Sequence, residues 1–494
     1  MTRRIITAIT ALSLLLMVPA SAADAVAGIS NAFKTKTKSV AIFKDGYGFF
    51  IREGKARLYD GWAMTDHIPK ATAGSFWFYT VEPDTRVSTI RSTARNEVHF
   101  DDTSELVDAL RHKVGVQIKV TTADASAEGE LIRVLDDMAL VKSGKDVRVV
   151  QVADIKSAQV LGNPLMLRVE SRKKIDEVTI DMGYLQQGIS WVPTYSLELI
   201  NSSEARITLR ATISNSVEDL VGSKVYLVVG VPNFYLKNQL DPLTAHSVGI
   251  SILGNVRGPA GPAGASQIVS NALRADFNAE GPAVAPASLS IPMEGLQEMY
   301  FYEADIPEVL VGDVVMSTVL ADTVPYRHLF TWNADASDID HYLVLTNKLS
   351  SPLTTGPLMV LQNGKPISQD QLRYTPIGAE TRVKLTQTTD MRADVSEKEI
   401  ERKEPERIGD RVYIPVTSET TLKITNHRDD AADVEVTRSV VGKVLDASDK
   451  GLIRSRPNPD DALNPLSNIT WTTVVDAGKE RILTYRYLRY VRAQ

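Results

Sequence analysis

The stretch YLQQGISWVPTYSLEL, residues 184–199, decides the fold class expected for this chain. From Tyr195 onward, apolar and polar residues alternate with the period of two that marks a strand with one buried face. Gly188 provides a turn before it, and Pro193, which has no backbone donor, belongs at the start or edge of a strand. Trp191 supplies a large apolar anchor, a role more common for tryptophan than that of a ligand platform. The stretch therefore predicts a turn followed by a half-buried strand.

Strand signals of the same kind continue to the end of the chain. Residues 205–215 alternate most cleanly, and Asn363-Gly364 is a typical two-residue hairpin turn. Repeated half-buried strands indicate antiparallel β-sandwiches over residues 164–494. Residues 233–287 interrupt this pattern with GPAGPAG and other small residues, so we expect a flexible insertion there.

Two smaller β-rich regions precede the sandwiches. Residues 24–100 contain a hairpin signal at Lys44-Asp45-Gly46 and are interpreted as an N-terminal β-domain. Residues 102–161 begin with an amphipathic helix that Asp102 can cap, and five strand-like pieces follow it. These pieces are residues 114–120, 129–135, 138–142, 147–152 and 155–160. The expected fold class is therefore mainly β, with multi-domain antiparallel β-sandwiches and a small SH3-like or Sm-like barrel near the N-terminus.

A heavily charged stretch lies between Asp390 and Arg411. Its composition would tolerate a helix, but Pro405 and Gly409 interrupt it and its apolar residues are too few for a core face. We expect an exposed edge strand whose charges discourage edge-to-edge association, with a helix as the alternative.

The first 22 residues have the three parts of a secretory signal peptide. Arg3 and Arg4 precede an apolar run, and Ala20-Ser21-Ala22 forms a small-residue cleavage site. An uncleaved anchor helix is the alternative, but the apolar run is shorter than the roughly 20 residues that span a bilayer. We therefore expect an exported protein, periplasmic or secreted, with no transmembrane segment in its mature chain.

Composition narrows the possible chemistry and partners. The chain has no cysteine, which excludes disulfides, thiolate metal sites and cysteine nucleophiles. Without Arg3 and Arg4 the chain has 53 basic and 61 acidic residues, a net charge of −8. This balance disfavours nucleic acid as a partner.

Residues 188–199 match the pattern G-x-S-W-x-P-x-Y-x-L-x-L. This pattern resembles the signature of the C-terminal domain of unknown function in mucoidy-inhibitor-like bacterial proteins. Further segments are similar to that family, and the resemblance covers roughly residues 165 to 494: EMYFY at 298–302, PLMV at 357–360, NGK at 363–365, ITNHRD at 424–429 and AGKE at 477–480. Residues 40–61 resemble the family's amino-terminal β-domain more weakly.

The resemblance implies a link to the cell envelope and brings no catalytic residue with it. The motif residues Gly188, Ser190, Trp191, Pro193 and Tyr195 would have structural roles. Many relatives carry a long coiled coil between the two parts, whereas this chain has no heptad pattern and places the barrel-like segment there. A role that depends on a coiled coil therefore does not transfer to this protein.

One group of side chains could form a metal site. Asp335, Asp338, Asp340 and His341 lie within seven residues and could hold a hard cation such as calcium. The segment lacks the glycine and the distal glutamate of an EF-hand, so a solvated loop between strands is favoured. No cofactor is expected, because the chain has no phosphate-binding glycine loop and no dinucleotide fingerprint.

No hydrolase motif accompanies these residues. The sequence thus favours a non-enzymatic protein with a binding or structural role in the cell envelope, and its partner would be an envelope protein or polysaccharide. Two alternatives stay open. A metal-dependent hydrolase would need the four candidate ligands to converge, and a carbohydrate-binding module would need several exposed aromatic side chains on one sheet face.

Overall fold

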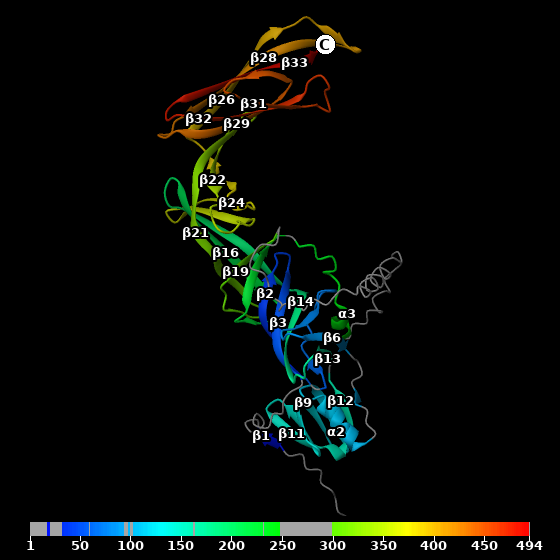
Figure 1. The fold of residues 1–494 in the computed structure, drawn as a ribbon. Coiled ribbons are helices and arrows are strands. Elements are labelled where there is room, and N and C mark those ends of the chain that lie inside the picture. Colours follow the sequence, from blue (N-terminus) through cyan, green and yellow to red (C-terminus); the bar gives the residue numbers. More distant parts are fainter. Residues whose placement is uncertain are drawn as a thin grey trace, which may run out of the picture. The chain divides into compact units, whose positions relative to one another are not determined.

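The computed structural model describes residues 17–19, 32–58, 60–92, 97–98, 102–161, 164–230, 232–247 and 299–493. The fold is mainly β with several antiparallel sheets, which confirms the predicted fold class (Figure 1). The chain forms two compact units. Unit 1 comprises Met1–Trp191 and Ile213–Val315, and unit 2 comprises Val192–Thr212 and Met316–Gln494.

The segment 102–161 in unit 1 forms a helix followed by five strands, as the sequence predicts. The elements are α2 (Thr103–Arg111), β8 (Gln117–Thr122), β9 (Ser126–Val134), β10 (Met138–Ser143), β11 (Asp146–Gln151), the short 3-10 helix η1 (Val152–Asp154) and β12 (Ile155–Val160). Asp102 caps the helix by accepting from the backbone N–H groups of Ser104 and Glu105. The strand order is β11-β10-β9-β8-β12, and the apolar face of α2 packs on the core of this sheet.

Two short strands extend this sheet at its edges, β1 (Met17–Pro19) beside β11 and β7 (Glu97–Val98) beside β12. Strand β1 lies within the predicted signal peptide, and the rest of residues 1–22 lies outside the described residues. Within the described parts of the chain, no helix has the length and apolarity needed to cross a membrane.

The largest sheet of unit 1 joins segments that are far apart in the sequence. Its order is β19-β18-β2-β3-β14-β5. These strands are β2 (Lys36–Ile42), β3 (Tyr47–Arg57), β5 (Trp77–Thr80), β14 (Glu177–Gln187), β18 (Lys224–Val229) and β19 (Tyr300–Ala304). The smaller sheets of unit 1 are β4 (Trp62–Thr65), β13 (Leu165–Ser171) and β6 (Thr85–Ser92), and the pair β17 (Leu220–Val221) and β20 (Glu308–Val309).

These pairings correct the predicted domain boundaries. Residues 24–100 do not form a β-domain of their own, because β3 pairs along its whole length with β14 and β2 pairs in parallel with β18. The predicted break at residue 164 therefore separates strands that share one sheet. Local patterns show that a strand forms, whereas the choice of partner depends on side chains distant in the sequence.

The beginning of the predicted insertion 233–287 is attached to unit 1. The backbone N–H of Asp241 donates to Ala71 at 2.9 Å, and that of Ala73 donates to Gln239 at 2.8 Å. The short helix α3 (Pro242–Ser247) follows. Residues 248–287 lie outside the described residues.

Unit 2 holds most of a ten-stranded sheet and a five-stranded sheet. The ten-stranded sheet contains β15 (Ile189–Leu199), β16 (Glu204–Asn215), β21 (Val314–Asn333), β22 (Ile339–Thr346), β23 (Gly356–Gln362), β24 (Lys365–Leu372), β25 (Glu380–Gln387), β29 (Ala432–Val441), β31 (Leu452–Arg456) and β32 (Leu466–Val475). The five-stranded sheet contains β26 (Met391–Arg402), β27 (Glu406–Ile408), β28 (Arg411–Asn426), β30 (Lys443–Ala447) and β33 (Glu480–Arg492). Between the two sheets lies an apolar core that includes Trp332 and Trp471.

Two local predictions are confirmed in unit 2. Asn363 and Gly364 connect β23 to β24 with φ angles of 51° and 72°, the positive values that a type I′ turn requires. Most of the charged stretch 390–411 forms β26, an almost wholly exposed strand at the edge of the five-stranded sheet, and the short strand β27 follows it. Its charges oppose pairing with another strand edge.

Three buried asparagines make the same set of hydrogen bonds at strand ends. Asn215 ends β16, Asn347 follows β22 and Asn426 ends β28, and none is more than 1% exposed. In each, the side-chain NH₂ donates to three backbone carbonyls and the side-chain oxygen accepts from the N–H two residues later. The carbonyls are those of Glu218, Val309 and Leu310 for Asn215, of Ser351, Thr375 and Pro376 for Asn347, and of Asp430, Val475 and Asp476 for Asn426. Each asparagine thus ties the loop after its strand to the turn before β21, β25 or β33.

Candidate functional site

A polar cleft lies on unit 2. Its volume is about 960 Å³, and strands β21, β22, β25 and β29 and the segment around β24 contribute its walls. Most of the lining side chains are charged or carry amide or hydroxyl groups. The cleft therefore suits a ligand that makes many hydrogen bonds.

Strand alternation explains why polar groups gather in this cleft. Asp340 and Tyr342 point to the same face of β22, because successive side chains of a strand alternate between faces. Tyr342 lies opposite Lys384 of β25, and Val344 lies opposite Arg382. Leu343 of β22 and Val383 of β25, which lie between these residues, are buried on the other face.

Ion pairs hold most charged groups of the cleft. Lys384 Nζ lies 2.8 Å from Asp340 Oδ2, and Arg382 donates to both carboxylate oxygens of Glu435 at 3.2 and 2.9 Å. The hydrogen bond that Lys384 donates to Asp340 raises the pKa of Lys384, and those that Arg382 donates to Glu435 raise the pKa of Arg382. The Asp370 carboxylate accepts from the backbone N–H of Lys384 at 2.7 Å. The walls are therefore set in place before a ligand binds.

The four candidate metal ligands bond to separate partners. Asp335 Oδ1 accepts a hydrogen bond from Arg438 at 2.7 Å. Asp338 accepts from Gln387 at 3.3 Å, and Asp340 accepts from Lys384 at 2.8 Å. His341 lies on the opposite face of β22. Asp338 and Asp340 line the polar cleft. Across the described residues, no three histidine, aspartate or glutamate side chains are placed to hold one metal ion. The convergence that a metal-dependent hydrolase requires of these four residues does not occur.

His341 belongs to an aromatic stack on that opposite face. Its Nε2 lies 2.8 Å from Nδ1 of His328, and its ring stacks on Phe330 at 4.4 Å between centroids. Arg428 covers the Phe330 ring at 5.2 Å. Burial, then His328 and Arg428, lowers the pKa of His341 to about 4, although Asp430 opposes the shift. At neutral pH both rings are therefore uncharged, and one donates a hydrogen bond to the other.

This stack predicts a loss of stability in acid. An unfolded histidine takes up a proton near pH 6.5, whereas folded His341 does so only near pH 4, so the unfolded state binds more protons between these values. The free energy of unfolding is expected to fall as the pH drops from about 6.5 to about 4. Urea titrations at several pH values should show a weaker pH dependence in His341→Phe than in the wild type. The matched control, exposed His427→Gln, should keep the wild-type slope, and an equal slope in His341→Phe would contradict this prediction.

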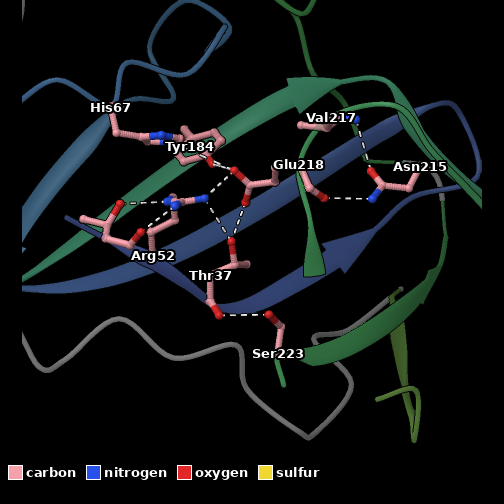
Figure 2. Close-up of polar contacts among 9 residues, drawn as sticks. Thr37, Arg52, His67, Tyr184, Asn215, Val217, Glu218 and Ser223 are labelled. Carbon is pink, nitrogen blue, oxygen red and sulfur yellow. Dashed lines mark hydrogen bonds and ion pairs between the residues drawn. The ribbon is translucent and has the colours of Figure 1, made fainter. Parts of the chain in front are cut away.

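Unit 1 contains a second constellation of titratable groups, centred on Glu218 (Figure 2). Glu218 accepts from Arg52 Nη1 and Thr37 Oγ1, both at 2.5 Å, and from Tyr184 Oη at 2.9 Å. Arg52 also donates to the Thr35 hydroxyl at 2.8 Å and to the Thr35 carbonyl at 2.6 Å. The side chains of Arg52 and Glu218 are only 11% and 13% exposed. Glu218 lies three residues after Asn215, whose side-chain amide donates to its carbonyl, so this cluster fastens the end of β16 to strands β2, β3 and β14.

The pKa shifts in this cluster favour a fixed structure over acid–base chemistry. Burial and the Glu218 carboxylate raise the pKa of Tyr184 well above its ordinary value. Burial, with a contribution from Arg52, lowers the pKa of His67 to about 4. His67 Nε2 lies 3.9 Å from Glu218, but the ring is neutral at pH 7 and the contact is not an ion pair. Both Tyr184 and His67 thus keep their protonation states across the physiological range.

The motif residues lie where the chain passes from β14 to β15. Gly188 has a φ angle of 119°, and a Cβ there would meet Ser216 Oγ at 2.9 Å, so a larger residue is excluded. Trp191 is fully buried and donates from Nε1 to the Val228 carbonyl at 3.2 Å. Tyr195 is also buried, and its hydroxyl accepts from the backbone N–H of Thr354 at 2.9 Å. Ser190 and Pro193 lie between these anchors on β15.

The sequence patterns do not identify most residues of the polar cleft as candidate site residues. Arg382 and Glu435 are 53 positions apart, and Lys384 and Asp340 are 44 apart, so no local motif joins them. The alternation of side chains along β22 and β25 was the one sequence feature that could have pointed to these residues, because it predicts which of them share a face.

No protein-family model matches the chain, and no curated protein is significantly similar to it.

Proposed function

We propose that this protein is an exported, non-enzymatic binding protein of the cell envelope and that its polar cleft holds a glycan. The observation that supports this proposal most strongly is the cleft itself, which is large, open and lined by charged and amide side chains already fixed by ion pairs. A sugar offers hydroxyl groups that donate to carboxylates and accept from amides and cations. The expected leader over residues 1–22 and the resemblance to mucoidy-inhibitor-like proteins support the envelope location.

Two tyrosines add an apolar surface to the cleft. Tyr342 is partly exposed, and Tyr374 is 52% exposed. Trp332 also lines the cleft but is only 1% exposed. Two accessible rings are fewer than the several expected for a flat carbohydrate-binding face, so hydrogen bonds would carry more of the recognition than stacking.

The electrostatics of the cleft favour binding over hydrolysis. A glycosidase needs one carboxylic acid that keeps its proton near neutral pH. Here Lys384 lies against Asp340, Arg382 against Glu435, and Arg327 against Glu380 at 3.2 Å. These three carboxylates are thus held by ion pairs within the protein rather than left open to a substrate.

Removal of the exposed ring tests this proposal. Tyr374→Ala is expected to weaken glycan binding up to about tenfold, the effect of one aromatic contact. The mature protein would be screened on an array of bacterial envelope oligosaccharides, and each hit measured by titration calorimetry. Tyr235→Ala is the matched control, because Tyr235 is 82% exposed and lies outside the cleft. An array without hits, or equal affinities for the two variants, would count against a glycan site in this cleft.

A further inference from the structure

One basic group of the polar cleft is not neutralised. Of the three basic side chains that line the cleft, Arg382 is held by Glu435 and Lys384 by Asp340. The third, Arg373, makes no side-chain hydrogen bond or ion pair with any described residue and is exposed. A guanidinium group presents a planar fork of donors that matches a carboxylate in a bidentate manner. The wall of the cleft thus offers an open anion-binding group.

The backbone that carries Arg373 is firmly fixed. The carbonyl of Arg373 accepts from Thr375 Oγ1 at 2.8 Å, and the backbone N–H of Tyr374 donates to Thr355 Oγ1 at 3.0 Å. Thr375 exchanges two backbone hydrogen bonds with Leu353, at 2.9 and 2.8 Å. This anchoring fixes the point from which the Arg373 side chain extends, although a ligand must still order the side chain itself.

A buried acceptor in the same cleft lacks a donor. Asp340 Oδ2 bonds to Lys384, but Asp340 Oδ1 is shielded from solvent and has no hydrogen-bond partner. A shielded acceptor without a donor is costly, but a ligand hydroxyl does not reach this oxygen in the present side-chain position. The cleft therefore presents one open cation, that of Arg373.

The other acidic groups of the cleft do not oppose an anionic ligand strongly. Glu435 is paired with Arg382, and Glu380 with Arg327. Asp370 accepts from two backbone N–H groups, those of Gln371 and Lys384, at 2.8 and 2.7 Å. Asp338 accepts only from the uncharged Gln387 and Ser337, both at 3.3 Å, so Arg373 is the group that can favour an anionic ligand here.

From these contacts we infer that the cleft selects acidic saccharides, in which a sugar carboxylate binds the Arg373 guanidinium. This inference rests on the proposed glycan-binding function and narrows it to uronic-acid-type ligands. Neutral sugars of the same shape would lack the group that pairs with the guanidinium.

The test compares each acidic glycan with its own neutral form. Calorimetry would measure the mature protein with oligogalacturonate and oligoglucuronate and with the carboxyl-reduced form of each. The acidic form is expected to bind about tenfold to a hundredfold more tightly, as one charge-assisted contact provides, and added salt should reduce this preference. Arg373→Gln should abolish the preference, whereas Arg373→Lys should keep part of it.

Arg454→Gln is the control, because Arg454 is an exposed arginine on β31 outside the cleft. Equal binding of acidic and reduced forms, or a preference that survives in Arg373→Gln, would overturn the inference and leave glycan binding intact. If neither form binds and the envelope array is also blank, the proposed function fails together with the inference.

Discussion

Arg52→Met is expected to lower the free energy of unfolding of unit 1 by about 3 to 5 kcal/mol. The substitution removes the cation from a pair in which both side chains are nearly buried and leaves the Glu218 carboxylate in a poorly solvated place. It also leaves the hydroxyl and carbonyl of Thr35 without their donor. The large effect arises from the uncompensated charge, because an intact buried pair contributes little net stability of its own.

Urea unfolding followed by tryptophan fluorescence measures this effect. Trp62, Trp77 and Trp191 report on unit 1 and can be isolated by replacing Trp332 and Trp471 with phenylalanine. Arg86→Met is the matched control in the same unit. Arg86 pairs with Glu170 at 2.7 Å, but the two side chains are 65% and 49% exposed, so its loss should cost less than about 1 kcal/mol. Similar effects of the two substitutions would mean that burial of the Arg52–Glu218 pair is not what makes it sensitive.

A double variant separates the charge from the packing. In Arg52→Met with Glu218→Gln the carboxylate is neutral, so no buried charge is left without a partner. The double variant is therefore expected to be less destabilised than the sum of the single variants, by about 1 kcal/mol or more. Additive effects would show that lost hydrogen bonds and packing account for the loss.

The local structure of this protein follows from its sequence patterns. The alternation after Tyr195 gives β15, Lys44-Asp45-Gly46 gives the turn between β2 and β3, and the charged segment after Asp390 gives the exposed strand β26. Each of these features depends on residues within one or two turns of chain, so a single sequence suffices to predict it.

Pairing between distant segments was not predictable in the same way. The parallel pairing of β2 with β18 joins residues that are more than 180 positions apart, and no local pattern specifies it. The polar cleft depends on such pairings, because Glu435 reaches Arg382 only when β29 lies beside β21 and β21 beside β22. The four candidate ligands, which the sequence had left as the less favoured alternative, do not converge for the related reason that neighbours on a strand point to opposite faces, as Asp340 and His341 do.

The three asparagines follow similar residues in the sequence, but their shared structural role becomes clear only from the hydrogen bonds in the structure. ISN, LTN and ITN end at Asn215, Asn347 and Asn426, each at the end of an apolar strand pattern. Their spacing is irregular, which hides the repeat from a search for a fixed period. Their common role depends on carbonyls that lie 28 to 95 residues further along the chain.

Asn426→Ala is expected to destabilise unit 2 by about 4 kcal/mol, because it leaves buried backbone groups without partners. Asn426 is fully buried and donates to the carbonyls of Asp430, Val475 and Asp476 at 2.9, 3.0 and 3.2 Å. Its side-chain oxygen also accepts from the N–H of Arg428 at 3.0 Å. Alanine can form none of these four hydrogen bonds. A single water molecule in the vacated space would have to bond to all three carbonyls and to the N–H group to replace them.

The direction of these bonds gives a sharper test than their number. Asn426→Asp keeps the shape and the acceptor for Arg428 but turns an oxygen toward three carbonyl oxygens, so it should destabilise the unit at least as much as alanine at neutral pH. Urea unfolding followed through Trp332 and Trp471, the only tryptophans of unit 2, measures both variants against the exposed Asn468→Ala. If Asn426→Asp were as stable as the wild type, the hydrogen bonds donated by the Asn426 amide could not be what stabilises the end of β28. The proposed structural role of the Asn215 and Asn347 amides would then fail as well. A loss confined to the two Asn426 variants would instead establish that donation by the Asn426 amide holds the end of β28, the arrangement that Asn215 and Asn347 repeat at β16 and β22.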